Sequence, residues 1–235
     1  MVFYQLERRV GSLVGSITTT TENNSVTIVG KVVSKLEFSH EVYGEGFYNF
    51  MLDVPRLSDV NDILPITISE RLIQNIQFEE GASFEIEGQF RSYNSYNNEA
   101  NKLMLTVFAR DIKPIEDITT VKNPNQIALN GFVCKRPIYR TTPFGREICD
   151  ILLAVNRQYN KSDYIPCIAW GRNARYSENL KVGENIKVWG RVQSRSYQKT
   201  LENNEVTTKV AYEVSVIKME IAGEKSEPAA EETGA

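Results

Sequence analysis

Hydrophobic and polar residues alternate with a period of two through much of the chain. Val26 and Ile28, for example, are separated by polar Thr27. Such alternation places apolar side chains on one face of a strand, and it predicts half-buried β-strands. Residues 70–78 and 172–180 lack the alternation, and each segment is long enough for one short helix. The pattern therefore predicts an all-β chain that contains two short helices.

This pattern occurs twice, because the chain contains an internal repeat at a nearly constant offset. SVTIVGKV at 25–32 aligns with QIALNGFV at 126–133. The further pairs, in chain order, are FYNFMLDVPR with ICDILLAVNR, ILPITI with YIPCIA, GASFEIEG with GENIKVWG, and LTVFA with YEVSV. Self-similarity over separated segments indicates two copies of one domain.

Each copy has the pattern of a small closed barrel. Five strands with a helix between the third and fourth is the plan of the OB-fold. We therefore predict two tandem OB-fold five-stranded barrels, each with a short helix between strands three and four. The expected divisions are a partly flexible lead-in at 1–24, repeat one at 25–117, a linker at 118–124, repeat two at 125–222, and a disordered acidic tail at 223–235.

The net charge of −3 hides a difference between the repeats. Repeat one contains 8 Lys and Arg residues against 15 Asp and Glu residues, whereas repeat two contains 15 against 9. A basic domain attracts polyanions and an acidic domain repels them. We therefore interpret repeat one as a degenerate acidic copy, and we expect a polyanion to bind repeat two.

The sequence shows no pattern typical of catalysis, metal binding or membrane insertion. His40 is the single histidine, and the cysteines, Cys134, Cys149 and Cys167, lie in apolar segments without the spacing of a zinc site. No apolar run approaches the ~18 residues of a membrane span, and the N-terminus lacks a secretory leader. We expect no enzymatic activity, no cofactor and no metal, and we expect the protein to be cytoplasmic.

Repeat two interleaves aromatic residues with cations, a combination that suits single-stranded nucleic acid. Unstacked bases pack on aromatic faces, which stabilises a complex by about 1–3 kcal/mol per base, and cations neutralise phosphates. The candidate aromatics are Tyr159, Tyr164, Trp170 and Tyr197. The candidate cations are Arg140, Arg157, Lys161, Arg172, Lys181 and Arg195.

Several aromatic residues have an alternative structural role. Tyr164 and Trp170 lie at the two ends of a predicted strand and could belong to the barrel core, and Tyr197 could anchor a loop. Tyr139 could either pack or stack. Trp189 is out of phase with its buried neighbours, so we expect it at an interface rather than in the binding site.

Repeat two also resembles the bacterial single-stranded DNA-binding protein family. The residues that carry the resemblance are NQIALNG at 125–131, RPIYRT at 136–141, Gly145, LAVNR at 153–157, YIPCIAWG at 164–171, LKVG at 180–183, GRVQSRSY at 190–197 and YEVSV at 212–216. The resemblance implies that the four candidate aromatics stack on bases. It also implies that Arg140, Arg172, Lys181 and Arg195 line the DNA backbone, in a tandem variant of the family.

Repeat one departs from this pattern at the equivalent positions. The first three aromatics are replaced by Ser58, Ile63 and Ser69, and only Tyr93 and Tyr96 offer a counterpart to Tyr197. Carboxylates that would repel phosphates are found nearby at Asp59, Asp62 and Glu70. By alternation, we expect mostly core positions for the aromatic cluster of Phe38, Tyr43, Phe47, Tyr48 and Phe50.

The function predicted from the sequence is therefore sequence-independent binding and protection of single-stranded DNA in replication, recombination and repair. The alternative is an OB-fold protein-interaction module of the replication or restart machinery with weak nucleic-acid affinity. A preference for DNA over RNA stays open, because stacking does not distinguish the two sugars. The expected partners are single-stranded DNA, a second copy of the chain in a homodimer with four barrels, and replication or repair proteins.

Overall fold

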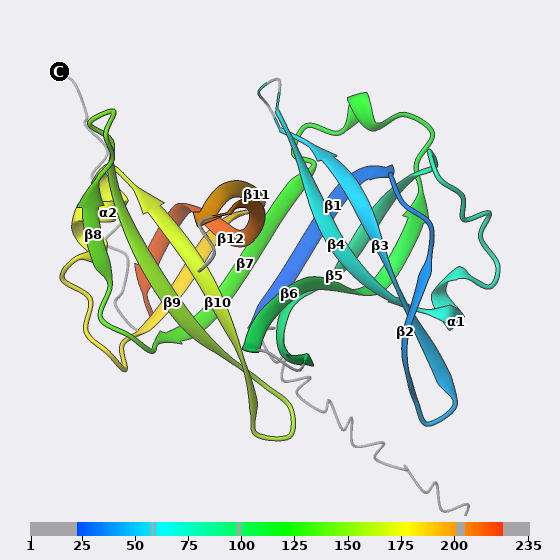
Figure 1. The fold of residues 1–235 in the computed structure, drawn as a ribbon, viewed down its shortest axis with the longest axis horizontal. Helices are drawn as coiled ribbons and strands as arrows, with labels where there is room; N and C mark the ends of the chain where they lie inside the picture. The colour runs from blue at the N-terminus through cyan, green and yellow to red at the C-terminus, as the bar shows by residue number, and fades with distance from the viewer. Residues whose placement is uncertain (1–22, 57, 59, 98–99, 201–204, 223–235) are drawn as a thin grey trace, which may run out of the picture.

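The computed structural model describes residues 23–56, 58, 60–97, 100–200 and 205–222. Its strands form one continuous sheet of 12 strands that closes into two adjacent barrels (Figure 1). Most of the predicted lead-in and all of the predicted tail lie outside the described residues, as does Asp59.

The two barrels contain the same elements in the same order. The first is built from β1 (Asn24–Val32), β2 (Glu37–Val42), β3 (Glu45–Pro55), β4 (Asn61–Ser69), α1 (Glu70–Ile73), β5 (Ser83–Asn97) and β6 (Ala100–Pro114). A 3-10 turn, η1 (Ile118–Thr120), follows. The second is built from β7 (Asn125–Val133), β8 (Ile138–Thr141), β9 (Glu147–Arg157), β10 (Lys161–Trp170), α2 (Arg172–Ser177), β11 (Asn185–Thr200) and β12 (Val206–Ile221).

The predicted pair of OB-fold barrels is confirmed, with one difference in strand count. β1 and β2 both pair with β3, so they are two parts of the first strand of the OB plan. The first strand is interrupted between β1 and β2 because of a local hydrogen bond. There, Met51 N donates to the Ser34 hydroxyl at 2.8 Å rather than to a strand carbonyl. In repeat two the corresponding segment contains Pro137, which has no N–H to donate to a ladder.

Each barrel closes through a parallel pairing between its third and fifth strands. β4 pairs with β6 in register Ile66↔Val107, and β10 pairs with β12 in register Cys167↔Val214. All four of these side chains are buried, as the alternation predicts. Both short helices follow the third strand of their barrel, and both are shorter than the segments expected from the sequence.

The aromatic cluster of repeat one is only partly in the core. Phe47 and Phe50 are buried, but Phe38 and Tyr43 are exposed, so the expectation of a mostly buried cluster is wrong for these two residues. The reason is that the β2–β3 hairpin projects beyond the barrel, where none of the described residues forms a second layer over it (Figure 1). The alternation along a strand shows which side chains share a face. It does not show whether another part of the protein packs on that face.

The two barrels are joined by antiparallel pairing of β1 with β7, and this pairing is symmetric. Val26 pairs with Ile127, which is its equivalent in the internal repeat. Asn24↔Leu129 and Ile28↔Asn125 lie on either side and exchange under the same operation. A pseudo-twofold axis therefore passes through the Val26–Ile127 pair and relates the two repeats.

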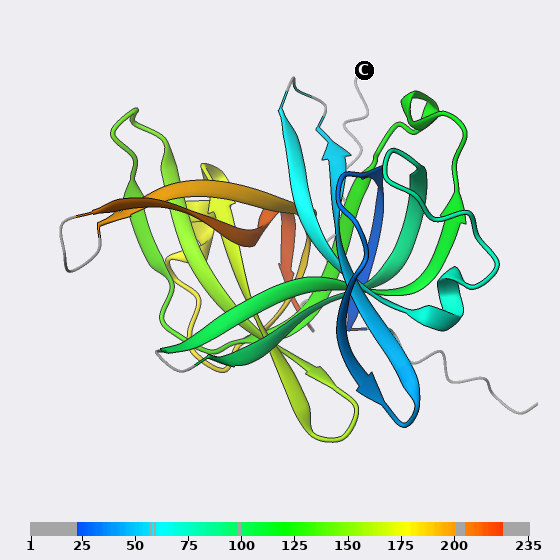
Figure 2. The same cartoon turned by 45° about the vertical axis from the view of Figure 1, so that its right-hand side comes forward.

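Long hairpins from each repeat reach across to the other. The β5–β6 hairpin extends beyond the first barrel and lies against the second (Figure 2). There the backbone N–H of Ser92 donates to Asp163 at 2.9 Å, and Tyr164 N donates to the Ser92 hydroxyl at 2.7 Å. Because these bonds link β5 to β10, the repeats form one connected body. In the described part of the chain, no helix is long and apolar enough to cross a membrane.

Candidate nucleic-acid interface

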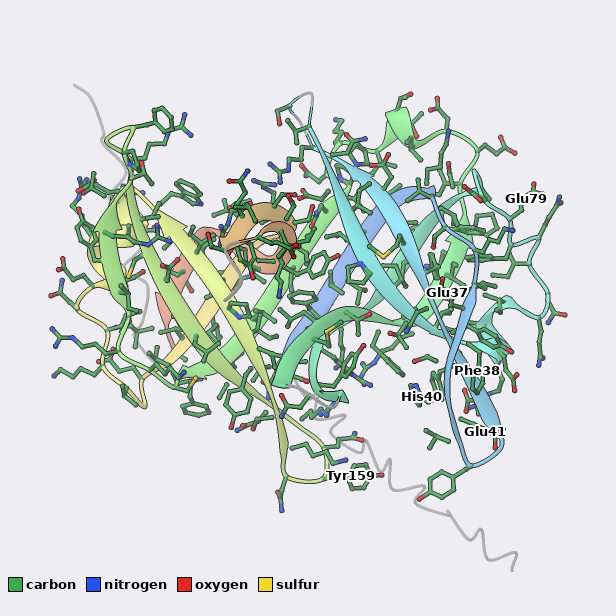
Figure 3. The ribbon with its side chains drawn as sticks, viewed as in Figure 1. Glu37, Phe38, His40, Glu41, Glu79 and Tyr159 are labelled. Atoms are coloured by element: carbon green, nitrogen blue, oxygen red, sulfur yellow. The ribbon has the colours of Figure 1, made fainter. Side chains whose placement is uncertain are left out.

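The β9–β10 hairpin presents Tyr159 at its tip. Tyr159 and Asn160 have φ angles of 63° and 53°, the left-handed conformations that a tight hairpin turn requires. The Tyr159 side chain is 89% exposed and projects from the end of the hairpin (Figure 3). A tyrosine in this position gains little from packing within the chain, so its ring is available to stack on a ligand.

Tyr164 and Trp170 lie on one side of β10, outside the barrel. Their side chains are 47% and 37% exposed, whereas Ile165, Cys167 and Ala169 between them are buried. The alternation therefore directs both rings away from the core, and the structure does not support the core alternative for either residue. An exposed Trp and Tyr on one strand form a surface on which bases can stack.

Tyr197 lies on β11 and is partnered by a cation. The guanidinium carbon of Arg195 is 5.9 Å from the centroid of the Tyr197 ring, within the range of a cation–π contact. Arg195 Nε also lies 3.4 Å from a carboxylate oxygen of Glu213. These contacts place an aromatic face and a positive charge together on the β11–β12 hairpin.

The remaining predicted cations are in different environments. Arg140 forms an exposed ion pair with Asp150 at 2.9 Å, a kind of pair that contributes little to stability and can exchange partners. Arg172 begins α2, and Lys181 lies in the loop between α2 and β11; both are exposed. Neither residue lines the groove described next, so the predicted cations are not gathered into a single cluster.

A groove with a volume of about 1140 Å³ lies at the junction of the two repeats. From repeat two it is lined by Arg157, Tyr159 and Lys161, all predicted as site residues. From repeat one it is lined by Tyr43, Arg91 and Arg110 among others. The sequence did not predict these repeat-one residues, because the net negative charge of repeat one does not show that cations gather on one part of its surface.

Four cations, Arg91, Arg110, Arg157 and Lys161, line the groove against the single carboxylate of Asp163, so its lining among the described residues is positive. Arg91 donates two hydrogen bonds to Gln89 Oε1, at 3.1 and 2.9 Å, and its guanidinium carbon lies 3.8 Å from the centroid of the Phe108 ring. Burial lowers the pKa of Arg91, and repulsion from Arg157 lowers it further. Two cations that repel each other in a partly desolvated groove favour the binding of an anion between them.

Arg157 also has a structural contact. Its Nη1 lies 3.7 Å from Asp163, which is buried, and its Nε is buried with no hydrogen-bond partner among the described residues. Asp163 accepts the Ser92 N–H as well. Arg157 therefore contributes both to the junction of the repeats and to the wall of the groove.

Asp62 does not have the position expected from the sequence. Its side chain is fully buried and accepts hydrogen bonds from Arg56 at 2.6 and 2.7 Å, from Ser194 N at 2.7 Å and from Arg191 at 3.3 Å. Two guanidinium groups neutralise its charge, so the prediction that Asp62 repels phosphates at the surface is wrong. Asp62 instead ties β4 of repeat one to β11 of repeat two.

Two further aromatics, Tyr139 and Trp189, have contacts within repeat two. Tyr139 packs beside the core, and its hydroxyl donates to Glu147 at 2.6 Å, so it is a packing residue. Trp189 lies half-buried on the outer face of the sheet, with Lys218 Nζ 5.0 Å from its ring centroid. Beside it, a smaller hollow of about 390 Å³ is bordered by Ile217, an exposed residue.

Comparisons with known proteins converge on repeat two. The model of the single-strand binding protein family matches residues 124–221. "Single-stranded DNA-binding protein 2" of Listeria innocua is 36% identical over 81 residues, which are 32% of this chain and 51% of that protein. "Single-stranded DNA-binding protein 1" of Clostridium acetobutylicum is 34% identical over 97 residues, which are 38% of this chain and 88% of that protein.

A solved structure extends the similarity to both barrels. The wild-type single-stranded DNA binding protein from Thermus aquaticus superimposes with a TM-score of 0.69 at 19% sequence identity, over 88% of this chain and 96% of that chain. At this identity the comparison concerns the fold. The chain spans about half the length of several of the curated relatives that it matches.

Proposed function

Because this chain belongs to the single-strand binding protein family, we propose that it binds single-stranded DNA without sequence preference. The observation that carries the proposal is the set of exposed rings on repeat two, Tyr159, Tyr164 and Trp170, together with a cationic groove that Tyr159 lines. In the cell, this activity would protect single strands during DNA replication, recombination and repair. The corresponding location is the cytoplasm, in association with the nucleoid.

The proposed mechanism is binding without a chemical step. Bases stack on the exposed rings of repeat two, each contributing about 1–3 kcal/mol, while cations neutralise the phosphates and release condensed counterions. Stacking uses the face that every base has, so it does not require a particular sequence. The fully buried and neutralised Asp62 supports this mechanism, because it removes one source of repulsion expected from the sequence.

Titration with oligo-dT at several salt concentrations tests the function. We expect quenching of Trp and Tyr fluorescence, since Trp170 and the tyrosines would stack on bases. The logarithm of the affinity should fall with the logarithm of the salt concentration, by about 0.7 for each phosphate contacted. Duplex DNA of the same length is the control, and an equal affinity for duplex and single strand would refute the proposal.

We also propose that two copies of the chain form a homodimer through the outer face of the sheet. Exposed Ile217 and half-buried Trp189 lie on this face of repeat two. The net charges on the same face support contact between unlike repeats. On repeat one, Lys113 pairs with three carboxylates, those of Glu85, Glu87 and Asp111, so the face keeps an excess of negative charge. On repeat two, Lys187 and Lys218 occupy the ladder positions equivalent to Glu85 and Asp111, and Glu220 pairs with Lys218 alone, so the excess is positive. In a twofold dimer, repeat one of each copy would face repeat two of the other.

Light scattering coupled to size exclusion tests the assembly. The expected mass is twice the chain mass of 26.7 kDa. A mass of one chain or of four chains would contradict the dimer. The substitution Lys218→Glu reverses the charge on repeat two and should weaken the dimer. Adding Asp111→Lys places a positive charge on repeat one opposite the new carboxylate, and it should restore the stability of the dimer. Replication and repair proteins remain the proposed further partners.

A further inference from the structure

The pseudo-twofold axis through Val26 and Ile127 creates two equivalent positions at the junction of the repeats. At one position, the β9–β10 hairpin of repeat two faces the β5–β6 hairpin of repeat one. At the other, β3 and β4 of repeat one face β11 and β12 of repeat two. Every residue that lines the first position therefore has a counterpart at the second, and the two can be compared residue by residue.

The first position carries cations that the second lacks. Arg110 is the bulged residue of β6, and its counterpart at the equivalent bulge of β12 is Ile217. Lys161 corresponds to Val60, and the stacking residue Tyr159 corresponds to Ser58. The groove of about 1140 Å³ is lined by Arg110, Lys161 and Tyr159, so it is positive and bears an exposed ring.

The second position is occupied by protein contacts. Its two arginines, Arg56 and Arg191, both bind the buried carboxylate of Asp62. Gln193, the counterpart of Arg91, donates to the side chain of Glu213 at 2.7 Å, and both are buried. The polar groups at this position are already paired with one another, and their charge is balanced by two carboxylates.

The geometry points to a single crossing for the DNA: the strand passes from repeat two onto repeat one through the cationic groove, where Arg91 and Arg110 bind its phosphates. This inference rests on the proposed single-strand binding function. It departs from the expectation that repeat one takes no part in binding. Because the lining of this junction carries cations that the equivalent junction lacks, the bound strand crosses between the barrels at one defined place.

Aromatic residues border the same groove on both sides. Tyr43, at the tip of the β2–β3 hairpin, is 104% exposed and lines the groove together with Tyr159. The two hairpins project from the same side of the molecule, one from each repeat (Figures 1 and 2). A strand in the groove would therefore find a ring on each wall and the guanidinium groups of Arg91 and Arg110 on the wall that repeat one provides.

Charge reversal at Arg110 tests the crossing, because its side chain is exposed and the change need not disturb the core. We expect Arg110→Glu to weaken binding of long oligo-dT by about tenfold or more, and to lower the salt slope by about 0.7, the value of one lost phosphate contact. Lys35→Glu is the matched control: Lys35 is an exposed cation of repeat one that does not line the groove. This control should bind as the unchanged protein does.

The length of the oligonucleotide separates the crossing from binding as such. One OB-fold covers about 4–16 nucleotides, so a series of oligo-dT from about 8 to 40 nucleotides samples one barrel and then both. Arg110→Glu should match the unchanged protein on the shortest oligonucleotides and lose affinity only on the longer ones. Tyr43→Ala should show the same dependence on length.

Two results would overturn the inference. One is an Arg110→Glu variant that binds long oligo-dT as tightly as Lys35→Glu does, with its urea midpoint unchanged. The other is an equal loss on the shortest and longest oligonucleotides. If the unchanged protein fails to bind oligo-dT at any length, the proposed function itself is wrong, so the two failures can be told apart.

Discussion

Replacing Asp62 with alanine removes the contact that ties β4 of repeat one to β11 of repeat two. The carboxylate is fully buried and accepts hydrogen bonds from Arg56, Arg191 and the backbone N–H of Ser194. Removing one partner from a buried ion pair usually costs about 3–5 kcal/mol, because an uncompensated charge is left behind. Here the two arginine side chains keep 22% and 30% of their surface exposed, so water can partly rehydrate them. We therefore expect a loss near the lower end, about 3 kcal/mol.

The pseudo-twofold axis provides a matched comparison, because Asp163 is the counterpart of Asp62. Asp163 accepts one backbone hydrogen bond, from Ser92 at 2.9 Å, and its nearest arginine atom is 3.7 Å away. Asp163→Ala leaves the buried Ser92 N–H unsatisfied and removes the carboxylate that lies 3.7 Å from Arg157. Because this ion pair is longer than those of Asp62, we expect a cost of about 1–3 kcal/mol. Asp62→Ala should therefore destabilise the protein more than Asp163→Ala does, although both remove one buried carboxylate.

Urea denaturation followed by circular dichroism measures both losses, with the slope against urea checked for constancy. Hydrogen exchange adds a local measurement, because the Ser194 amide should exchange faster in Asp62→Ala and the Ser92 amide should not. Equal destabilisation by the two substitutions, or a loss of under about 1 kcal/mol for Asp62→Ala, would refute the assignment of Asp62 as the stronger link between the repeats.

Two further predictions concern the stacking rings and the buried thiols. Trp170→Ala and Tyr159→Ala should each weaken oligo-dT binding by about 1–3 kcal/mol. Ser58→Ala, at the position in repeat one equivalent to Tyr159, should have no effect on binding. If Trp170→Ala unfolds the protein without a specific loss of binding, Trp170 is a core residue. Burial raises the pKa of Cys149 to about 11. The unreactive thiol form therefore dominates at pH 8, and Ellman's reagent should label Cys149 slowly in the folded protein and rapidly in urea. Rapid labelling of the folded protein would contradict this burial.

Much of the fold could be predicted from the sequence because it depends on local patterns. Period-two alternation identifies strands such as those that contain Ile66 and Val107, and a repeated pattern implies a repeated domain. The exposure of Tyr159 could also be predicted, since a ring in a polar hairpin has nothing to pack against. These properties depend on residues that are close together along the chain.

Other features depend on contacts between distant segments. The pairing of β1 with β7 places the hairpins of one repeat against the strands of the other. This pairing buries Asp62 beside Arg191, which is 129 residues away in the chain, and turns a carboxylate expected to repel DNA into a structural link. A count of charges in repeat one cannot reveal this, because it does not separate buried, paired charges from exposed ones.

The existence of two barrels, the basic character of the second, and the rings of repeat two that could stack on bases are all predictable from the sequence. The position of Arg91 and Arg110, which line the same groove as Tyr159 and Lys161 although they belong to the acidic repeat, depends on how the two barrels pack together. The physical reason is that the net charge of a segment is a sum over all of its faces, whereas a bound polyanion responds to the charges on the one face that it contacts.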